Sequence, residues 1–371
     1  MKYKICHLTT VHNRYDPRIF YKECISLQRA GYDVSLIAAD NESNVIKDGI
    51  KIINVGRKSQ KRLYRVFIST FMVFKIARKL NADIYHFHDP ELIPYMFILK
   101  IMGKKIIYDV HEDYFSSIRQ KEYIPHILRL FISRIYFIVD RLFTKRFNII
   151  LAEKCYKYMY PDGVFVLNYP RAEHFNFERK NLGNKLIYTG NVTEKRGAFI
   201  YAEILKRIET VDIYLIGRCS KNLADKLFNI VNGSKRLVIK GVNSYIDYKV
   251  ILESYRDESL LAGLILFPEE GAYKGREPTK IFEYMAAGLP VICSNFPAWE
   301  NIVKEHNCGI CVDPLNINEI VRVIYYLLDN PKEAKIMGEN GRKAVFNKYN
   351  WALGEKALIG LYNKLLRFEN N

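Results

Sequence analysis

One fifteen-residue segment carries the residue types that bind a phosphate group. It covers residues 276–290 and has the sequence REPTKIFEYMAAGLP. Pro278 suits the first turn of a helix, where its missing N–H costs nothing, and Thr279 follows it. The free backbone N–H groups of that turn attract an anion, and Lys280 adds a positive charge beside them. The segment therefore predicts a phosphate site at the start of a helix.

Glu283 extends this site towards a second ligand group. It follows Lys280 by three residues, so the two side chains share one helix face. A carboxylate one turn away from a phosphate can accept two hydrogen bonds from a vicinal diol such as ribose. Taken alone, the pair is also a common surface ion pair. The whole segment, which Gly288 ends, favours the ligand site.

Histidines and acidic residues gather at the ends of two predicted strands. His86 and His88 lie two residues apart, so their side chains point the same way, and Asp89 follows. Together with His111 and Glu112 they could form a metal site. Such clusters are more often polar strand ends, and we predict no metal here.

Three charged residues follow the first predicted strand. Asp16, Arg18 and Lys22 could bind an acceptor or a donor there. The alternative is a local Asp16–Arg18 ion pair with a solvated Lys22 at helical spacing.

The elements that must position these residues alternate along the chain. Short β-branched or aromatic runs alternate with helix-period segments, which is typical of parallel sheets with helices on both faces. Strands are predicted over residues 4–9, 33–38, 50–55, 84–88, 105–110, 149–152, 164–167, 185–189, 212–216, 237–240, 264–267, 290–293 and 309–312. Helices are predicted over 18–30, 63–80, 93–102, 124–147 and 351–367, with others between the later strands.

A boundary is predicted after the strand that ends near residue 167. Pro170 forces an extended backbone at the residue before it, and the polar stretch that follows is rich in turn residues. We therefore expect an N-terminal domain over 1–168, a linker over 169–184, and a C-terminal domain over 185–350. Two doubly wound domains of this kind face a cleft, and ligands bind beyond the carboxyl ends of their strands.

The charge of the chain calls for an anionic partner. The 371 residues carry a formal charge of +17, and residues 1–168 hold 28 Lys or Arg against 16 Asp or Glu. Residues 57–79 hold eight basic residues and no acidic one, beside an apolar stripe of Leu63, Phe67, Phe71 and Phe74. Residues 124–147 carry a second basic stripe of Arg134, Arg141 and Lys145 among large apolar residues.

Basic amphipathic helices of this composition suit an anionic membrane surface. The alternative is that the apolar stripes face the domain core and the cations are solvated. Binding to nucleic acid is disfavoured, because the chain contains no recognised binding module.

Several other classes of protein are disfavoured. Seven scattered cysteines argue for a reducing compartment, and the single CxxC at 308–311 has no second pair to complete a zinc site. No secretory signal or apolar run of membrane-spanning length is visible. There is no GxGxxG after the first strand, no GxxxxGK[ST], no GxSxG and no HExxH.

The segment at 276–290 resembles the C-terminal signature of retaining glycosyltransferases of the GT-B fold in glycosyltransferase family 4. Other segments resemble a branch of that family common in surface-polysaccharide synthesis. They are YDPRIFYKE at 15–23, HFHDPEL at 86–92, YDVHEDY at 108–114, YTGNVTEKRG at 188–197 and YNW at 349–351. The resemblance extends over nearly the whole chain.

The resemblance implies an α/β GT-B fold with two Rossmann-like domains, in which the helix of residues 351–371 packs back on the N-terminal domain. It implies transfer of a sugar from a nucleotide sugar, expected to be a UDP-sugar, to a cell-surface glycan precursor. An acceptor on a lipid-phosphate carrier would fit the basic amphipathic helices. No DxD triplet is present, so we expect no obligatory metal and no other cofactor. The leaving phosphate itself would assist deprotonation of the acceptor. We expect the protein in the cytoplasm, peripheral at the inner face of the plasma membrane.

The resemblance also implies roles for individual residues. Glu283 would hold the ribose, Arg196 and Lys280 the diphosphate, and Gly190 would allow its close approach. His111 would lie beside the donor sugar or its leaving phosphate; the alternative is a buried structural histidine. The implied donor site comprises Gly190, Asn191, Arg196, Pro278, Thr279, Lys280 and Glu283, with His111, Arg196 and Lys280 catalytic. Asp16, Arg18, Lys22, His88 and Asp89 would bind the acceptor or line the cleft.

Two positions depart from the family pattern. Gly275 stands where the first carboxylate of the family's E-x7-E motif is expected, and Asn191 stands where the family often has Arg. We expect Lys280 to supply the missing cation, with Arg276 as its rival. These departures also support one alternative, a catalytically silent membrane scaffold. A sugar-nucleotide epimerase on the same fold is another, and a nucleic-acid binder a third.

Overall fold

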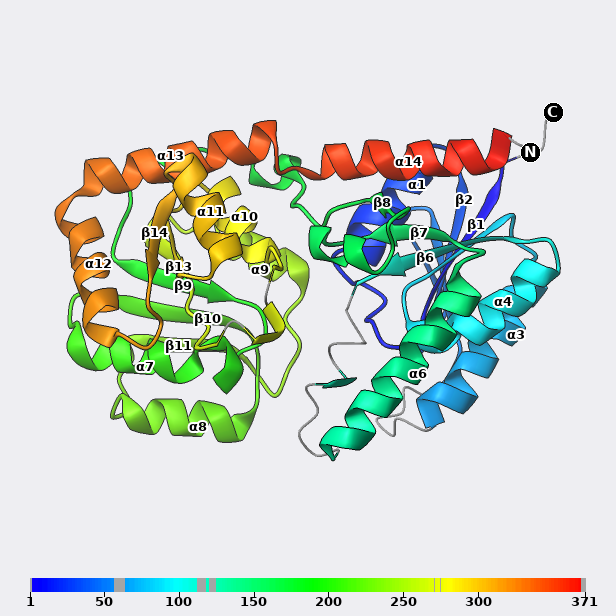
Figure 1. Ribbon diagram of the computed structural model, residues 1–371. Coiled ribbons are helices and arrows are strands. Elements are labelled where there is room, and N and C mark those ends of the chain that lie inside the picture. Colours follow the sequence, from blue (N-terminus) through cyan, green and yellow to red (C-terminus); the bar gives the residue numbers. More distant parts are fainter. Residues whose placement is uncertain are drawn as a thin grey trace. The chain divides into compact units, whose positions relative to one another are not determined.

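The computed structural model describes residues 2–56, 64–111, 118–119, 125–269, 271–273 and 275–367 (Figure 1). The chain forms two compact units, each with its own sheet. The first unit comprises Met1–Asn168 and Ala352–Asn371, and the second comprises Tyr169–Trp351. Residues 169–184, predicted as a linker, thus have their contacts in the second unit.

The first unit is built on an eight-stranded sheet with the order β3-β4-β2-β1-β5-β6-β7-β8. The strands are β1 (Lys4–Thr9), β2 (Asp33–Ala38), β3 (Val45–Lys47), β4 (Ile50–Asn54), β5 (Ile84–Phe87), β6 (Lys105–Val110), β7 (Asn148–Leu151) and β8 (Val164–Phe165). All neighbours pair in parallel except β3 and β4. Strand order reverses between β1 and β5, so their carboxyl ends form the place where such sheets bind ligands.

Helices cover both faces of this sheet (Figure 1). They are η1 (Ile19–Cys24) leading into α1 (Ile25–Arg29), η2 (Arg65–Ser69) leading into α3 (Thr70–Leu80), η3 (Pro90–Leu92), α4 (Ile93–Ile101), α6 (His126–Thr144), η4 (Lys154–Tyr158) and α14 (Trp351–Arg367). The helix that the sequence predicts at the end of the chain is α14, and it belongs to the first unit.

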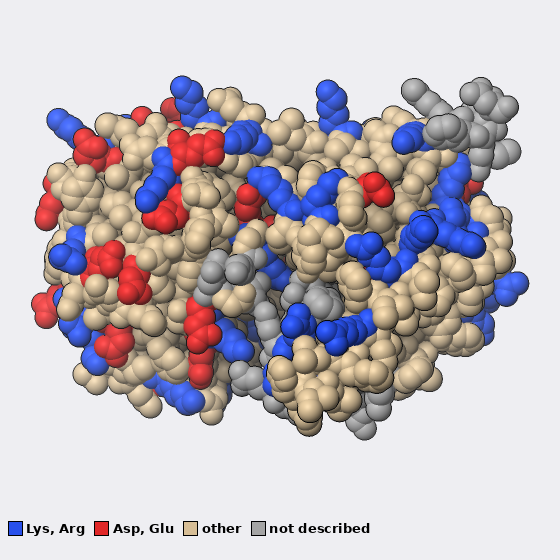
Figure 2. Space-filling model, viewed as in Figure 1, with Lys and Arg blue, Asp and Glu red and all other residues tan. Residues whose placement is uncertain are grey.

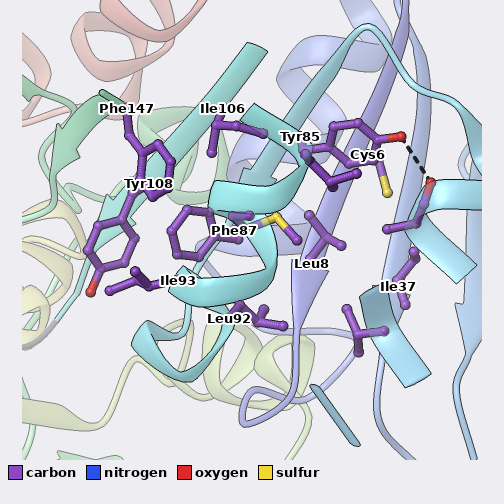
Figure 3. Close-up of a cluster of buried hydrophobic side chains, with 14 of the residues drawn as sticks. Cys6, Leu8, Ile37, Tyr85, Phe87, Leu92, Ile93, Ile106, Tyr108 and Phe147 are labelled. Carbon is purple, nitrogen blue, oxygen red and sulfur yellow. Dashed lines mark hydrogen bonds between the residues drawn. The ribbon is translucent and has the colours of Figure 1, made fainter. Parts of the chain in front are cut away.

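An aromatic core fixes the strands of the first unit (Figure 3). The rings of Phe87 and Tyr108 stack with centroids 4.6 Å apart, and Phe147 meets Phe87 edge-on. The hydroxyl of Tyr85 donates a hydrogen bond of 2.9 Å to the carbonyl of Ala77, which ties β5 to α3. Since β5 and β6 are both held by these rings, the residues just beyond their ends have fixed positions.

The second unit contains a six-stranded parallel sheet with the order β11-β10-β9-β12-β13-β14. The strands are β9 (Lys185–Thr189), β10 (Asp212–Cys219), β11 (Leu237–Val242), β12 (Leu260–Ile265), β13 (Val291–Ser294) and β14 (Gly309–Val312). The helical segments are η5 (Ala172–Phe175), η6 (Glu194–Arg196), α7 (Ala198–Arg207), α8 (Lys221–Ile230), α9 (Tyr248–Ser254), η7 (Gly271–Tyr273), α10 (Thr279–Ala286), α11 (Pro297–His306), α12 (Ile317–Asp329) and α13 (Pro331–Asn347).

The predicted fold class is confirmed by these two parallel α/β sheets. One predicted strand is misplaced: residues 264–267 share only 264 and 265 with β12, which begins four residues earlier. The whole run from 260 to 267 is apolar and buried, so periodicity alone does not locate its start. The short antiparallel strand β3 is not predicted. Among the described residues, no helix combines the length and apolarity needed to cross a membrane.

Candidate functional site

The best-defined part of the candidate site lies at the carboxyl end of β9 in the second unit. Gly190 follows β9 with a φ of +108°, which favours glycine, and its N–H donates to the carbonyl of Ile216. A Cβ at this position would lie 2.5 Å from Cε and 2.8 Å from Nζ of Lys280. The ammonium group of Lys280 therefore lies directly over the Gly190 backbone, and the predicted approach of a diphosphate to Gly190 stays a prediction.

A second cation lies near Lys280. Burial and the charge of Arg196 together lower the pKa of Lys280 to about 8, although the charge of Glu283 opposes the change. The hydroxyls of Tyr188 and Tyr273 raise the pKa of Arg196 against the effect of its burial. Two cations held close together in a partly buried site favour an anionic ligand between them.

The start of α10 matches the predicted phosphate site with one correction. Pro278 is the residue before the helix, in extended conformation, and Thr279 is the first helical residue. The sequence prediction of Pro278 within the first turn is therefore wrong by one position. Pro278 itself makes no side-chain capping hydrogen bond, and the N–H groups of this first turn are the ones predicted to attract an anion.

Glu283 is buried one turn further along α10, with 8% of its surface exposed. Its Oε2 accepts a hydrogen bond of 2.9 Å from the hydroxyl of Tyr255. Burial and the charge of Glu283 raise the pKa of Tyr255 and of Tyr248, so both phenols stay protonated. The surface ion pair considered for Lys280 and Glu283 is therefore wrong, because this carboxylate does not lie on a solvated face.

Asn191 and Gly275 are the two positions that depart from the family pattern. Asn191 is exposed, and its carbonyl accepts a hydrogen bond of 3.0 Å from Tyr188. Gly275 has a φ of +71°, a conformation that glycine adopts freely. The carbonyl of Arg276, the rival cation, accepts from the indole of Trp299.

In the first unit, three histidines come together on adjacent strands. His7 of β1 pairs in register with His86 of β5, and their ring centroids are 4.4 Å apart. The rings of His86 and His88 stack at 4.7 Å, which confirms that they point the same way. All three rings are buried.

His111 lies just beyond β6 and is the more open end of this cluster, with 13% of its side chain exposed. Its Nε2 lies 2.7 Å from Asp109 Oδ2 and 3.1 Å from Nδ1 of His88. The pKa of Asp109 stays well below its usual range, because Arg18 and His111 outweigh the effect of burial. A charged Asp109 thus orients the His111 ring and leaves its Nδ1 outside these contacts.

Arg18 and Lys22 take roles that neither sequence interpretation foresaw. Arg18 is 3% exposed and forms a bidentate pair with Asp109, through contacts of 2.8 and 2.9 Å. Lys22 is 2% exposed and donates a hydrogen bond of 2.7 Å to Oδ1 of Asn168. The solvated Lys22 is therefore wrong, and both residues are committed to positioning the strand ends.

Asp89 and Asp16 organise the loop after β1. Oδ2 of Asp89 accepts hydrogen bonds from the hydroxyl of Thr9 and the backbone N–H of Thr10, at 2.9 and 2.6 Å. Oδ1 of Asp16 accepts from the N–H groups at the start of η1, and its Oδ2 lies 3.5 Å from Nδ1 of His12. Asp16 and His12 are about a quarter exposed, so they can meet a ligand.

Four residues of this cluster are not among the site residues predicted from the sequence: His7, His12, Glu23 and Asp109. His7 is a polar residue within a buried strand, and this pattern could have marked it as a candidate site residue. Its partner His86 is 79 positions away, so the contact follows only once β1 and β5 are known to be neighbours. Glu112, which the sequence offered as one of several residues that could form a metal site, lies outside the described residues.

Two family models match separate parts of the chain. Residues 17–153 match Glycosyltransferase Family 4, and residues 250–344 match Glycosyl transferases group 1. A curated relative, the MMP alpha-(1->4)-mannosyltransferase of Mycolicibacterium hassiacum, is 29% identical over 85 residues. That match covers 23% of this chain and 21% of the relative's length.

Solved structures of the same fold extend over the whole chain. Sucrose-phosphate synthase from Thermosynechococcus elongatus has a TM-score of 0.74 at 16% identity, covering 99% of this chain and 100% of that one. HepE of Anabaena, solved in complex with UDP and glucose, has a TM-score of 0.72 at 11% identity, covering 98% and 100%. WaaG, a glycosyltransferase involved in lipopolysaccharide biosynthesis, has a TM-score of 0.69 at 15% identity, covering 95% and 98%. The solved structures show that the chain has the GT-B fold, and the two family models, each over part of the chain, identify a glycosyltransferase with one matched domain in each unit.

Proposed function

We propose that this enzyme is a retaining glycosyltransferase that moves a sugar from a UDP-sugar to a glycan acceptor without a catalytic metal. The observation that carries the proposal is the set of groups around Gly190. An ammonium lies over a bare backbone segment, a guanidinium is near it, and a buried carboxylate follows one helical turn away. A nucleoside diphosphate offers the matching groups, because it joins two phosphates to a vicinal diol.

The donor is held by the second unit. Glu283 accepts hydrogen bonds from the ribose hydroxyls, and Tyr255 holds this carboxylate in place. Lys280 and Arg196 bind the diphosphate, and the first N–H groups of α10 contribute to the same anion site. Breaking the sugar–phosphate bond leaves charge on the diphosphate, and one preorganised donor to such a charge is worth about 3–4 kcal/mol.

Uracil is the base we propose, since the similar HepE structure was solved with UDP and with UDP-glucose. The acceptor is bound by the first unit, where Asp16 and His111 are open to a ligand. His111 acts near the reacting centre, and Asp109 and Arg18 position its ring. The leaving phosphate takes the proton of the acceptor hydroxyl on the same face of the sugar.

The donor proposal is tested by thermal shift against UDP, GDP, ADP and CMP in the presence of EDTA. A ligand at 100 times its dissociation constant stabilises the folded protein by about 2.7 kcal/mol. We expect UDP to give this shift and Glu283→Ala to lose it. Glu253→Ala is the matched control, because that side chain is 78% exposed in the same unit.

Incubation with UDP-sugars then separates the alternatives. A glycosyltransferase needs an acceptor for turnover, whereas an epimerase converts the donor alone. A silent scaffold shows no shift with any nucleotide, and this result would overturn the proposal.

We also propose a lipid-linked acceptor and binding to the inner face of the plasma membrane. The helix α6 supports this proposal, because its apolar side chains face solvent. Ile127 is 83% exposed, Phe131 60% and Leu142 68%. The buried positions of α6 are instead polar: Ser133, Asp140 and Thr144.

The neighbouring η2 and α3 add to this surface. Phe67 and Phe71 are 63% and 49% exposed, whereas Phe74 packs on the core, and Leu63 lies outside the described residues. On the face of the first unit shown in Figure 2, Lys and Arg side chains lie among uncharged surface, and few acidic side chains are visible. Apolar side chains flanked by Lys and Arg favour insertion at an anionic headgroup boundary.

Sedimentation with lipid vesicles tests this surface. We expect binding to vesicles containing phosphatidylglycerol, weaker binding to neutral vesicles, and loss of binding in a Phe131→Ser/Leu142→Ser double variant. Leu315→Ser is the control, since Leu315 is 73% exposed in the second unit. Equal binding of the double variant and the control would contradict the membrane proposal and leave the donor proposal untouched.

A further inference from the structure

A second cluster of metal-ligating side chains lies inside the first unit, away from the residues assigned to the donor. His7, Glu23, His86 and His88 each present one ligand atom, and these four atoms all lie within 4.8 Å of one another. The four side chains are at most 2% exposed. They come from β1, η1 and the end of β5, so three separate segments converge on one point.

The histidine rings are oriented so that one nitrogen faces the cluster centre. Nδ1 of His86 lies 2.8 Å from the hydroxyl of Tyr362, and Nδ1 of His88 lies 3.4 Å from Oδ2 of Asp109. Both rings therefore direct Nε2 towards Glu23, at 3.8 and 3.9 Å from its Oε2. Metal-bound histidines are held in this way, by an outer hydrogen bond to the second ring nitrogen.

The charge at this point is not balanced by the described side chains. Two buried carboxylates, Glu23 and Asp109, share the single guanidinium of Arg18. Asp109 takes two hydrogen bonds from Arg18. Among the residues that the structure describes, neither oxygen of Glu23 accepts a hydrogen bond, and Nε2 of His86 has no partner. A buried carboxylate without hydrogen bonds is costly unless a cation or a proton neutralises it.

We propose that His7, Glu23, His86 and His88 bind one zinc ion. Ligand atoms about 2.0–2.2 Å from a tetrahedral zinc ion lie roughly 3.3–3.6 Å apart. The separation of 3.1 Å between His7 Nδ1 and His88 Nε2 and those of 3.8–3.9 Å from Glu23 Oε2 bracket this spacing. Three imidazoles and one carboxylate suit zinc, whereas magnesium and calcium prefer oxygen ligands.

A neighbouring set of His88, Asp109 and His111 also lies within ligand distance. It is the poorer site, because Arg18 occupies both oxygens of Asp109. The set considered and rejected in the sequence differs again, since it includes Asp89, whose Oδ2 is already bonded to Thr9 and Thr10. The proposed ion is structural: it joins β1, η1 and β5, and through Tyr362 it fixes α14 on the same unit.

Metal analysis of the full-length chain, purified without chelator from zinc-supplemented medium, tests this inference. We expect one zinc per chain after desalting, and cobalt substitution should give the intense visible bands of a tetrahedral site. Glu23→Gln keeps the shape of the side chain and should lose most of the metal. His306→Gln is the control and should keep it, because His306 belongs to the second unit and lies beside Tyr349.

The outcome does not depend on nucleotide binding, so it can fail or hold independently of the proposed function. Wild-type protein that takes up neither zinc nor cobalt in stoichiometric amount, even when refolded with the metal, would overturn the inference. Equal metal content in Glu23→Gln and wild type would overturn it as well, because the ion would then lie elsewhere. If Glu23→Gln fails to fold, the wild-type cobalt spectrum decides: bands of six-coordinate aqueous cobalt mean that no such site exists.

Discussion

Replacing Gly190 by alanine should weaken UDP binding through Lys280. The added Cβ would lie 2.5 Å from Cε and 2.8 Å from Nζ of that lysine, so the ammonium group must move away from the backbone. A hydrogen bond to a charged group contributes about 1.5–3 kcal/mol, so its loss should raise the Kd for UDP about 10- to 150-fold. The φ of +108° adds strain of about 1–3 kcal/mol, which lowers the Tm by about 2–4 °C per kcal/mol.

Gly233→Ala separates the two effects of this change. Gly233 also has a positive φ, +68°, and a Cβ there would meet nothing within 4 Å. We expect this control to lower the Tm and to leave the Kd for UDP unchanged in isothermal titration calorimetry. A Gly190→Ala protein that binds UDP as tightly as the wild type would refute the placement of the diphosphate over Gly190.

Three further predictions rest on buried charges. Burial lowers the pKa of Lys280 to about 8, and a diphosphate needs the cationic form of this lysine, so UDP affinity measured by calorimetry should fall about tenfold per pH unit above pH 8. Lys280→Arg should remove this fall in affinity. A fall that persists in that variant would assign it to another group. Asp109→Asn removes the bidentate carboxylate from buried Arg18 and leaves only its contact with Glu23, so urea unfolding should show a loss of about 3–5 kcal/mol. An unchanged midpoint would contradict the pairing. Burial raises the pKa of Asp140 from 3.8 to about 6 despite its hydrogen bond from Tyr160, so the unfolding free energy of the wild type should decrease by roughly 3 kcal/mol as pH rises through this range. Asp140→Asn should lack this decrease. Parallel stability–pH profiles of wild type and variant would show that Asp140 titrates normally.

The fold could be predicted from the sequence because parallel strands read as short apolar runs between helix-period segments. The strands β1, β2, β6, β9 and β14 begin and end where the sequence predicts. The boundaries of β12 could not be predicted, since its apolar run continues past the strand end and gives no period or turn residue. Strand order depends on contacts between distant segments and follows from the family resemblance, not from periodicity.

The donor residues of α10 were the predictable part of the site, because they belong to one short segment with local geometry. Lys280 and Glu283 share a helix face by spacing alone, and the structure confirms that both lie on α10. Arg18 and Lys22 could not be understood in this way, because their partners Asp109 and Asn168 are 91 and 146 residues away. Sequence spacing suggests ion-pair partners within one or two helical turns. A buried charged side chain instead pairs with a residue that the tertiary fold places beside it. The cleft and the acceptor role of the first unit stay predictions.

The central claim is that Lys280 binds the diphosphate and Glu283 the ribose of one nucleotide. Calorimetric titration of the wild type, Lys280→Met and Glu283→Ala with UDP, UMP and 2′-deoxy-UDP tests it most directly. We predict that Lys280→Met removes the preference for UDP over UMP, and that Glu283→Ala removes the preference for UDP over its 2′-deoxy analogue. Variants that keep both preferences, at whatever affinity, would show that these residues do not contact the donor and would contradict the account.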